Sequence, residues 1–216
     1  MHIKLPIETF YTKKELSLSK MLEINNWINE DLNQIRKILN KFKQPKTDEE
    51  IFYNLCFIIL VPQCKFKAIS IVVDKLKLLD FYNNDLDNLE DIIKPSRYKK
   101  RKTLFLKKMK TNFNEILRNL KNKLNDPDEA RSYLSQNVSG ISYKAASHFL
   151  RNMGIESLAI IDTHILKFLE VDYSWRYSIV ENHFKEIAKG FDLTPAELDA
   201  IIWRRYANIP FNEFIF

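Results

Sequence analysis

Two residues of this 216-residue sequence combine a reactive side chain with a spacing that could support covalent catalysis. Lys144 follows a glycine-containing turn, and Asp162 lies 18 residues later, directly before Thr163 and His164. A lysine amine attacks an electrophilic carbon as the free base and can then form a Schiff base with it. A fixed carboxylate beside the reacting carbon can stabilise positive charge and help to remove the proton of the amine. The two residue types would therefore allow amine-based covalent chemistry.

The surroundings of these two residues affect whether they can react. A lysine has a reference pKa of about 10.4, so it reacts near neutral pH only when it is desolvated or placed in positive potential. Lys144 is expected to open a helix, whose positive end disfavours the ammonium, and its aromatic and alanine neighbours are expected to exclude part of the water. Asp162 is expected to cap the next helix, which keeps its carboxylate fixed and ionised. The alternatives are that Lys144 only contacts a phosphate and that Asp162 is only a helix cap.

The element that positions Lys144 is expected to be a helix, a tight hairpin and a second helix over residues 126–153. Gly140 permits a positive φ and a close approach of the hairpin backbone to another group. Backbone N–H groups that point outward at a helix N-terminus can bind a DNA phosphate without reading a base. We therefore predict DNA contacts from Gly140, Ser142 and Tyr143. The alternative is an ordinary αα-hairpin with a glycine turn.

The rest of the sequence predicts an all-α protein. Glycine occurs at only three positions, and alternating strand-like stretches bounded by tight-turn dipeptides are nearly absent. Residues 47–50 form a capping-box sequence for a helix whose apolar run, 51–61, is expected to be central. Further helical patterns are found at 15–42, 65–79, 86–93, 98–122, 127–136, 143–153, 163–170, 175–189 and 195–206.

Positive charge is concentrated in one part of the sequence. The formal net charge is +6 and the isoelectric point about 9.1, which favours a polyanionic partner such as nucleic acid or an anionic membrane face. Two basic clusters, 99–102 and 107–110, lie on one expected helix and its entry. We predict that Lys99, Lys100 and Arg101 hold DNA phosphates. The alternative is a solvated helical face.

Several protein classes are disfavoured. No stretch of about 18 uncharged apolar residues is present, and the first residues lack the apolar core of a secretory signal, so we expect a soluble intracellular protein without a membrane partner. Cys56 and Cys64 are too few for a disulfide framework or a four-thiolate cluster. His148, His164 and His183 do not have metal-ligand spacing. We therefore expect neither a metal nor another cofactor.

The segment that ends at Lys144 resembles the hairpin of helix-hairpin-helix DNA glycosylases. Residues 138–144 correspond to a Leu-Pro-Gly-Val-Gly-x-Lys pattern, which ends in the nucleophilic lysine of this superfamily. Residues 158–164 are similar to the Val-Asp-Thr-His segment that holds its essential aspartate. The resemblance implies an all-α fold of two helical lobes with the active site in the cleft between them. It makes Lys144 the catalytic nucleophile and Asp162 its acidic partner.

Within this superfamily the sequence resembles the archaeal-type, or type 2, 8-oxoguanine DNA glycosylases. Endonuclease III-like relatives carry four C-terminal cysteines around an iron–sulfur cluster, and monofunctional adenine or alkylpurine relatives lack the hairpin lysine. The sequences of residues 140–152 and 198–203 resemble those of the type 2 branch. The resemblance implies a bifunctional glycosylase and AP lyase that excises 8-oxoguanine in base excision repair. Its expected partner is double-stranded DNA that contains an oxidised base.

The implied reaction begins with extrusion of the base from the duplex, followed by attack of Lys144 on C1′ and loss of the base. The resulting Schiff base leads to strand cleavage by β-elimination. We expect a monomer that works on the nucleoid in the cytoplasm of a prokaryotic cell. The chain is expected to be one unit with lobes at approximately 15–125 and 126–206 and a C-terminal pocket segment at 207–216.

Other site residues follow from weaker similarities. Ser142 replaces the usual second hairpin glycine, which requires a negative φ at this position. Gln63 lies in a segment similar to a Leu-Ser-x-Gln-Thr stretch and is a candidate to contact the orphaned partner base, or else a polar cap between two helices. Trp203, Phe214 and Phe216 are candidates to stack on the flipped purine, although the branch often ends in lysine. Alternatively, these aromatic residues only pack in the core.

Two other functions are compatible with the same residues. An endonuclease III-like lyase would act on oxidised pyrimidines or abasic sites. A non-catalytic helix-hairpin-helix protein would use the hairpin only to bind phosphates, and it would bind DNA without covalent chemistry.

Overall fold

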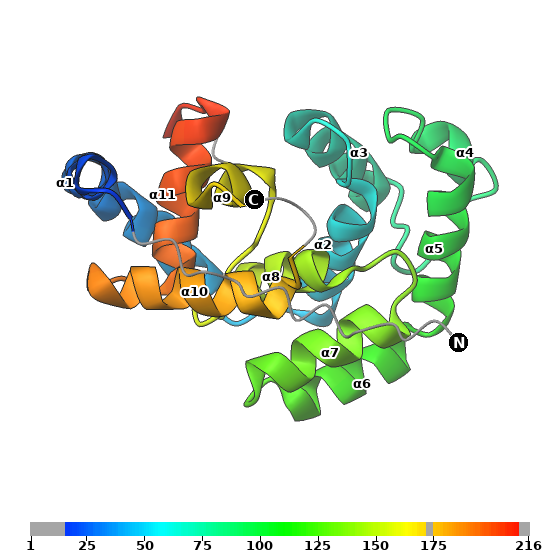
Figure 1. The fold of residues 1–216 in the computed structure, drawn as a ribbon. Helices are drawn as coiled ribbons and strands as arrows, with labels where there is room; N and C mark the ends of the chain where they lie inside the picture. Colours follow the sequence, from blue (N-terminus) through cyan, green and yellow to red (C-terminus); the bar gives the residue numbers. More distant parts are fainter. Residues whose placement is uncertain (1–15, 172–174, 212–216) are drawn as a thin grey trace, which may run out of the picture.

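The computed structural model describes residues 16–171 and 175–211, and the regular secondary structure of this part is entirely helical (Figure 1). The all-α prediction is therefore confirmed. Its helices are α1 (Leu18–Phe42), α2 (Asp48–Leu60), α3 (Phe66–Leu78), α4 (Leu89–Ile92), α5 (Lys99–Thr111), α6 (Phe113–Lys123), α7 (Pro127–Asn137), α8 (Tyr143–Asn152), α9 (Thr163–Leu169), α10 (Tyr177–Gly190) and α11 (Pro195–Ala207).

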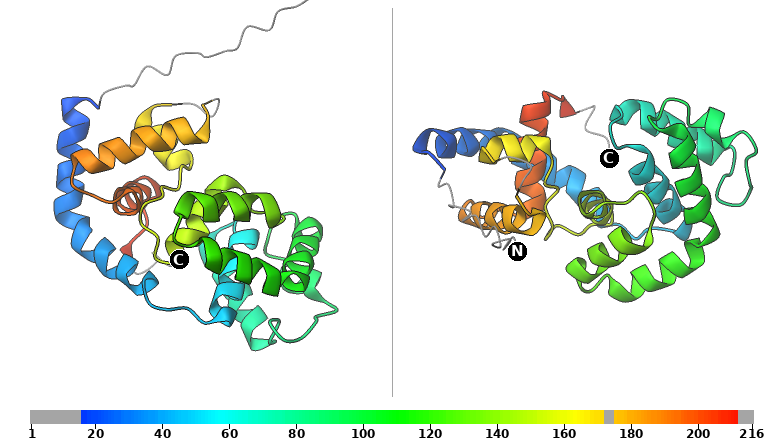
Figure 2. Two further views of the ribbon diagram at one scale, coloured as in Figure 1. Left: turned by 90° about the horizontal axis from the view of Figure 1, so that it is seen from below. Right: turned by 45° about the vertical axis from the view of Figure 1, so that its right-hand side comes forward.

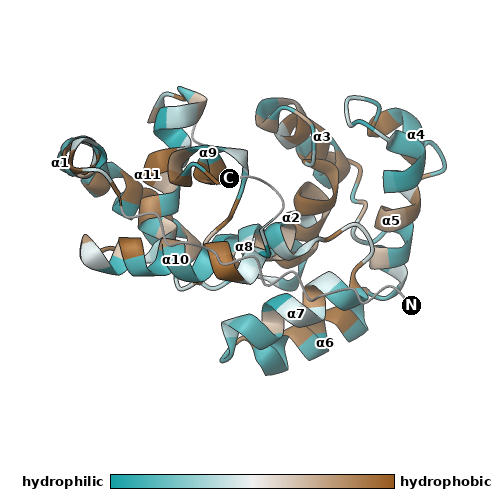
Figure 3. Ribbon diagram, in the orientation of Figure 1, coloured by the Kyte–Doolittle hydropathy of each residue, from teal (hydrophilic) through white to brown (hydrophobic). Residues whose placement is uncertain are grey.

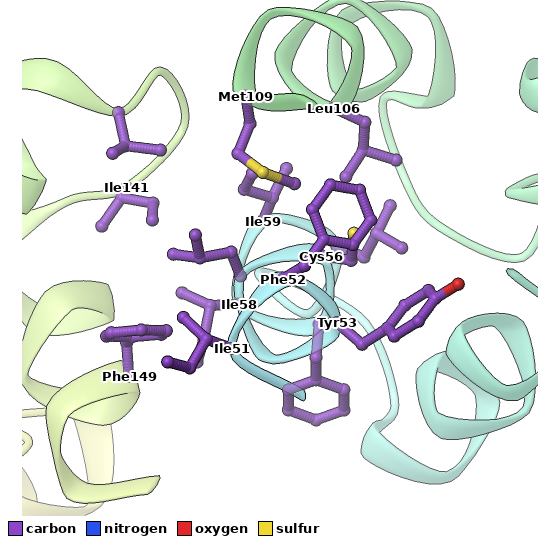
Figure 4. Close-up of a cluster of buried hydrophobic side chains, with 14 of the residues drawn as sticks. Ile51, Phe52, Tyr53, Cys56, Ile58, Ile59, Leu106, Met109, Ile141 and Phe149 are labelled. Atoms are coloured by element: carbon purple, nitrogen blue, oxygen red, sulfur yellow. The ribbon is translucent and has the colours of Figure 1, made fainter. Parts of the chain in front are cut away.

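Helix α2 lies at the centre of a hydrophobic core, as predicted. Its capping box is formed, because the backbone N–H of Glu50 donates to Oγ1 of Thr47 and that of Thr47 donates to a carboxylate oxygen of Glu50. The helix is mostly apolar along its length (Figure 3). Side chains from α5, the hairpin and α8 surround it (Figure 4). Burial on almost every side explains why the apolar run 51–61 has no polar face.

The single helix predicted over 98–122 is wrong, because the structure has two helices, α5 and α6, separated at Asn112. This residue has φ −99° and ψ 8°, so the helical geometry ends there. A straight helix of the predicted length would span roughly 37 Å and run past the core. The change of direction instead allows the buried faces of both helices, including Met109 and Phe113, to pack in the same hydrophobic cluster.

The described residues form two hydrophobic cores. The first contains buried residues from α2 through α8 and ends at Leu158. The second combines α1 with buried residues from Ala159 onward, and α1 packs against α11, which it crosses (Figure 2). These cores divide the chain differently from the predicted boundary at 125/126. Helix α1 joins the C-terminal helices because its apolar face is covered by them rather than by α2–α6.

Helix α11 is fixed to α1 by a buried carboxylate. Asp31 on α1 is 1% exposed and accepts hydrogen bonds from both Arg204 and Arg205. Trp27 packs edge-on against Tyr206 beside this cluster. Charged hydrogen bonds of this kind are among the stronger ones in proteins. The position of α11 matters because this helix forms one wall of the cavity described next.

Candidate active site

A cavity of about 1090 Å³ lies where the two cores meet. Lys144 and Asp162 both line it, on segments that come from different cores. Its other lining residues are Ile58, Val61, Pro62, Gln63, Cys64, Lys65, Phe66, Lys67, Ser142, Ala145, His148, Arg151, Ile160, His164, Asp199, Trp203, Ala207, Asn208 and Ile209. The expected cleft between two helical units is therefore present.

The hairpin has the backbone geometry that the sequence predicts. Gly140 has φ +89°, and a Cβ atom at this position would lie 2.5 Å from Cδ2 of Phe105. Ser142 has φ −83°, as its replacement of a glycine requires, and its Oγ accepts a hydrogen bond from the backbone N–H of Ala145. The turn is therefore held by its own residues and by one aromatic ring of α5. Lys144 follows as the second residue of α8.

One face of α8 supplies three polar cavity residues. Lys144, His148 and Arg151 are spaced at i, i+4 and i+7, so they lie on the same side of the helix. His148 and Arg151 are buried, whereas Lys144 is exposed at the cavity rim. The prediction that neighbouring side chains exclude water from Lys144 is therefore wrong for this structure. Ala145 and Ala146 are buried, whereas Lys144 is not.

His148 is a neutral part of the cavity wall. Burial lowers its pKa well below the ordinary value, and the positive charges of Arg151 and Lys144 lower it further. Its ring lies against two aromatic rings, those of Phe57 at 6.1 Å and Phe66 at 5.8 Å between centroids. An uncharged imidazole in this position adds to an aromatic surface and does not add a cation.

Asp162 is the N-cap of α9, as predicted. Its Oδ1 accepts hydrogen bonds from the backbone N–H groups of His164 at 2.8 Å and Ile165 at 3.1 Å. These bonds fix the carboxylate at the positive end of a helix. Because both cap bonds go to Oδ1, the other oxygen, Oδ2, is the candidate to act in a reaction in the cavity.

Asp199 and Arg151 form a buried pair beneath the rim, and sequence reasoning missed both. Asp199 is 2% exposed, and its Oδ2 lies 3.6 Å from Nη1 of Arg151. Burial raises the pKa of Asp199 to about 7; the negative charge of Asp162 also raises it, whereas Arg151 and Lys144 lower it. Burial lowers the pKa of Arg151 to about 10, so it stays cationic at neutral pH. The signal in the sequence was a single acid within the apolar run 198–202.

The aromatic wall of the cavity contains one predicted residue and one that was missed. Trp203 on α11 lines the cavity, and its ring centroid lies 5.4 Å from that of Phe66. Phe66 was not singled out in the sequence because it looks like any core residue at a helix start. Phe214 and Phe216 lie outside the described residues. Of the predicted pocket segment 207–216, the first three residues line the cavity.

Gln63 lies on the cavity in a strained loop after α2. Its φ is +61°, which is uncommon for a residue other than glycine. The hydroxyl of Tyr98, which also has a positive φ, donates to Oε1 of Gln63 at 3.3 Å. Strain of this kind persists where the surroundings impose it, and it is frequent at functional sites. Contact with an orphaned base stays a prediction.

The loop that carries Gln63 is held from below by a buried lysine. Nζ of Lys102 donates to the carbonyl oxygens of Leu60 at 2.6 Å and Pro62 at 3.0 Å and to Oγ of Ser96 at 2.9 Å. Lys102 is 5% exposed. It is therefore not part of a phosphate-binding surface, although its sequence neighbours suggested this.

The three basic residues predicted to contact DNA differ in their surroundings, and none lines the cavity. Lys99 forms an ion pair with Glu90 at 3.3 Å, whereas Lys100 and Arg101 are exposed. The guanidinium group of Arg101 lies 5.2 Å from the centroid of Phe105, the ring that contacts the hairpin glycine. Arg101 and the hairpin therefore belong to one continuous surface.

The described residues contain neither a metal-binding cluster nor a membrane span. Within 16–171 and 175–211, no group of three or more His, Cys, Asp or Glu residues could hold a metal ion. None of the helices in the same ranges is both long and apolar enough to cross a membrane.

The fold, together with a hairpin lysine and an N-capping aspartate on one cavity, defines the class of helix-hairpin-helix DNA glycosylases. Residues 28–193 match the family model described as 8-oxoguanine DNA glycosylase. Because the match extends over most of the sequence, this chain belongs to the 8-oxoguanine DNA glycosylase family.

Relatives and solved structures agree with this family. The chain is 34% identical to an 8-oxoguanine DNA glycosylase/AP lyase of Picrophilus torridus, over 85% of this chain and 91% of that protein. It is 32% identical to the protein of the same description from Methanocaldococcus jannaschii, over 88% of this chain and 94% of the relative.

The fold is similar to the crystal structure of the M. jannaschii 8-oxoguanine DNA glycosylase, with a TM-score of 0.77 at 27% identity. The match covers 89% of this chain and 97% of the M. jannaschii chain. The M. jannaschii glycosylase/lyase in complex with a 15mer DNA containing 8-oxoguanine gives a TM-score of 0.74 at 28% identity and covers 88% of this chain and 97% of that one.

Proposed function

We propose that this chain excises 8-oxoguanine from double-stranded DNA and then cleaves the abasic strand, as a bifunctional glycosylase and AP lyase. The observation that carries the proposal is the joint position of Lys144 and Asp162 on one cavity, in a chain that belongs to this family. The names of its relatives describe the same two activities. A cavity between two cores also offers the enclosed space that an extruded nucleotide requires.

The reaction begins at C1′ of the flipped nucleotide. The amine of Lys144 forms a bond to C1′, and the bond between C1′ and the base breaks, so that its electron pair leaves with the base. The carboxylate of Asp162 stabilises the positive charge that develops on the sugar and helps to take a proton from the attacking nitrogen. The departing base takes up one proton, which balances the one that the attacking nitrogen loses.

Strand cleavage follows from the same covalent bond. The bond between C1′ and the ring oxygen breaks, the oxygen takes a proton, and a protonated Schiff base to Lys144 remains. Loss of a proton from C2′ then expels the 3′-phosphate by β-elimination. Hydrolysis of the Schiff base returns the free amine, so a single lysine serves both activities.

The surroundings of the cavity support binding of a nucleotide in DNA. Four cationic side chains and two carboxylates line it, so its charge balance favours a phosphate-containing ligand. The aromatic pair Phe66 and Trp203 offers a surface for stacking on the base. The hairpin and the exposed Lys100 and Arg101 are proposed to hold the flanking phosphates. Gln63 is proposed to contact the partner base.

Because Lys144 is exposed, we propose that the bound duplex contributes to the activation of its amine. Closure of the cavity by DNA would remove water from the rim, which disfavours the ammonium form of an amine. We therefore propose that the amine becomes fully reactive only in the complex with DNA.

Borohydride trapping on a duplex that contains 8-oxoguanine tests the proposed function. We expect the wild-type chain and Lys189→Gln to form a covalent complex and Lys144→Gln to form none; Lys189 is an exposed lysine of α10 that does not line the cavity and serves as the control. A covalent complex in Lys144→Gln would contradict the assignment. DNA binding by the wild-type chain without trapping would indicate a non-catalytic protein. Faster excision of thymine glycol than of 8-oxoguanine would indicate an endonuclease III-like lyase.

We also propose that the enzyme acts as a monomer, on the nucleoid in the cytoplasm of a prokaryotic cell. The support for a monomer is that one chain supplies Lys144, Asp162 and the surrounding cavity. Light scattering at the concentrations used for the excision assay is expected to give the mass of one chain, 25.8 kDa. A stable dimer at these concentrations would contradict the proposal.

A further inference from the structure

The segment that leads into Asp162 has an unusual set of hydrogen bonds. Residues 158–161 are neither helix nor strand, and all four are buried. Buried backbone N–H groups need partners, and an irregular segment does not find them within itself. Leu158 packs in the first core and Ala159 in the second, so the chain crosses from one core to the other at this point.

Three successive backbone N–H groups of this segment are bound by side chains. The N–H of Ala159 donates to Oε1 of Glu181 at 3.1 Å. The N–H of Ile160 donates to Oδ2 of Asp199 at 3.0 Å. The third group, the N–H of residue 161, donates to the hydroxyl of Tyr177 at 3.2 Å, and this hydroxyl donates to the carbonyl oxygen of Ala159 at 2.8 Å. Side chains from α10 and α11 thus take the place of a neighbouring strand.

We propose that Tyr177, Glu181 and Asp199 are positioning residues that hold the carboxylate of Asp162 at the correct place relative to Lys144. This inference rests on the proposed function, in which Asp162 acts at C1′. The N-cap bonds of Asp162 fix its carboxylate only relative to α9. The three side chains fix the backbone that precedes it relative to α10 and α11.

A second set of contacts connects this segment to the helix of Lys144. Arg131 donates to both carboxylate oxygens of Glu181, at 2.7 and 2.6 Å, and to Oγ of Ser147 at 3.2 Å. Ser147 lies on α8 and is also 3.3 Å from the hydroxyl of Tyr177. Burial of a charged group is costly unless the group is paired and hydrogen-bonded, and Arg131 and Glu181 are paired with each other. The network therefore ties α8 to the backbone just before Asp162.

Asp199 supplies an independent link between the same two parts. Its carboxylate binds the backbone of Ile160 and also faces Arg151, which lies two turns after Lys144 on the same face of α8. The two candidate catalytic residues are thus joined by two separate sets of buried contacts. A displacement of about 1 Å in a catalytic group can lower a rate by about a hundredfold. Small losses in this network are therefore expected to affect the chemical step.

Tyr177→Phe tests the proposal, with Tyr53→Phe as a matched control. The hydroxyl of Tyr53 is buried in the first core, donates to the carbonyl oxygen of Leu76 at 3.4 Å and accepts from the N–H of Tyr82 at 3.2 Å. Both variants lose one hydroxyl with two backbone partners, and Tyr177→Phe also loses the contact with Ser147, so it is expected to lower the melting temperature by the same amount as Tyr53→Phe or somewhat more. The measurement is the single-turnover rate of 8-oxoguanine excision at saturating enzyme, well below both melting temperatures.

We expect Tyr177→Phe to lower this rate about tenfold to a hundredfold and Tyr53→Phe to change it less than twofold. The dissociation constant for DNA should stay unchanged in both, because neither hydroxyl lies on the proposed DNA surface. Equal rates for the two variants would overturn the proposal. Amide hydrogen exchange should show lost protection at Ile161, whose N–H loses its acceptor, only in Tyr177→Phe, and retained protection at Ile161 would also overturn it.

The pair Asp199→Asn and Asp199→Ala gives a second test that a simple loss of stability would not reproduce. An asparagine oxygen can still accept the N–H of Ile160, so we expect Asn to keep most of the excision rate and Ala to lose at least tenfold. Equal excision rates for Asn and Ala would contradict a positioning role. If the wild-type chain excises no 8-oxoguanine in the same assay, the proposed function itself is wrong, and the positioning role is wrong with it.

Discussion

The two candidate catalytic residues are held in place by opposite kinds of structure. Lys144 is positioned locally, because the glycine turn, the Ser142 cap and the first turn of α8 lie within a few residues of it. Asp162 is positioned by distant side chains, because residues on α10 and α11 bind the backbone before it. One residue depends on the local sequence and the other depends on how the helices pack. We call the turn, cap and first helical turn around Lys144 the local device, and the side chains of α10 and α11 that bind the backbone before Asp162 the distant device.

This difference explains which parts of the site could be derived from the sequence. A local device leaves a pattern, and the positive φ of Gly140 and the negative φ of Ser142 both follow from residue types at fixed positions. A distant device leaves no pattern near the residue it serves. Asp162 could be recognised as a helix cap from its neighbours, but nothing near it indicates Glu181 or Tyr177 as partners.

The largest effect is expected for Asp162→Asn, which changes the chemistry and leaves both positioning devices in place. Asparagine is as good an N-cap as aspartate, so the free energy of unfolding should change by less than about 0.5 kcal/mol. The excision rate should fall by about 10²- to 10³-fold, because a fixed charge at the reacting carbon is lost. Single-turnover excision and urea denaturation of the same preparation check both parts. Unchanged turnover would remove Asp162 from the mechanism.

Gly140→Ala should break the local device. A Cβ atom at φ +89° is strained, and it would lie 2.5 Å from Cδ2 of Phe105. We expect the free energy of unfolding to fall by about 2–3 kcal/mol, from strain and overpacking together. Gly190→Ala is the control, because this glycine lies in α10 and a Cβ atom there meets nothing within 4 Å. The control should leave stability unchanged or raise it by up to about 1 kcal/mol, as measured by urea denaturation.

The sequence predicted the helices better than their packing. All-α structure, a central α2 and the hairpin followed from periodicity and turn residues. The break at Asn112 did not, because it depends on where the core lies beyond the helix. Lys102 was grouped with surface lysines because charge runs do not reveal which member of the run turns inward. Phe66 and Asp199 became site residues only when α3 and α11 met α8 at the cavity.

The distant device should give folding stability a dependence on pH through Asp199. Burial raises the pKa of this carboxyl group to about 7, above its value in the unfolded chain, so the folded state favours the protonated form. Its contribution is fully present below about pH 4 and is lost as the pH rises through about 7. We expect a loss of roughly 2 kcal/mol between pH 5 and pH 6.5. Asp199→Asn should lose less over this interval, and parallel stability curves for the two proteins would contradict the assignment.

Ser142→Ala should give the smallest effect and the sharpest comparison between the two devices. The substitution removes one N-cap bond to Ala145, which is expected to cost about 1 kcal/mol of unfolding free energy. Thr194→Ala is the matched control, because Thr194 caps α11 through an equivalent bond and does not line the cavity. If local capping alone positions Lys144, only Ser142→Ala should reduce borohydride trapping, by a few-fold. Equal trapping in the two variants would mean that the buried contacts between α8 and the segment before Asp162 position both catalytic residues.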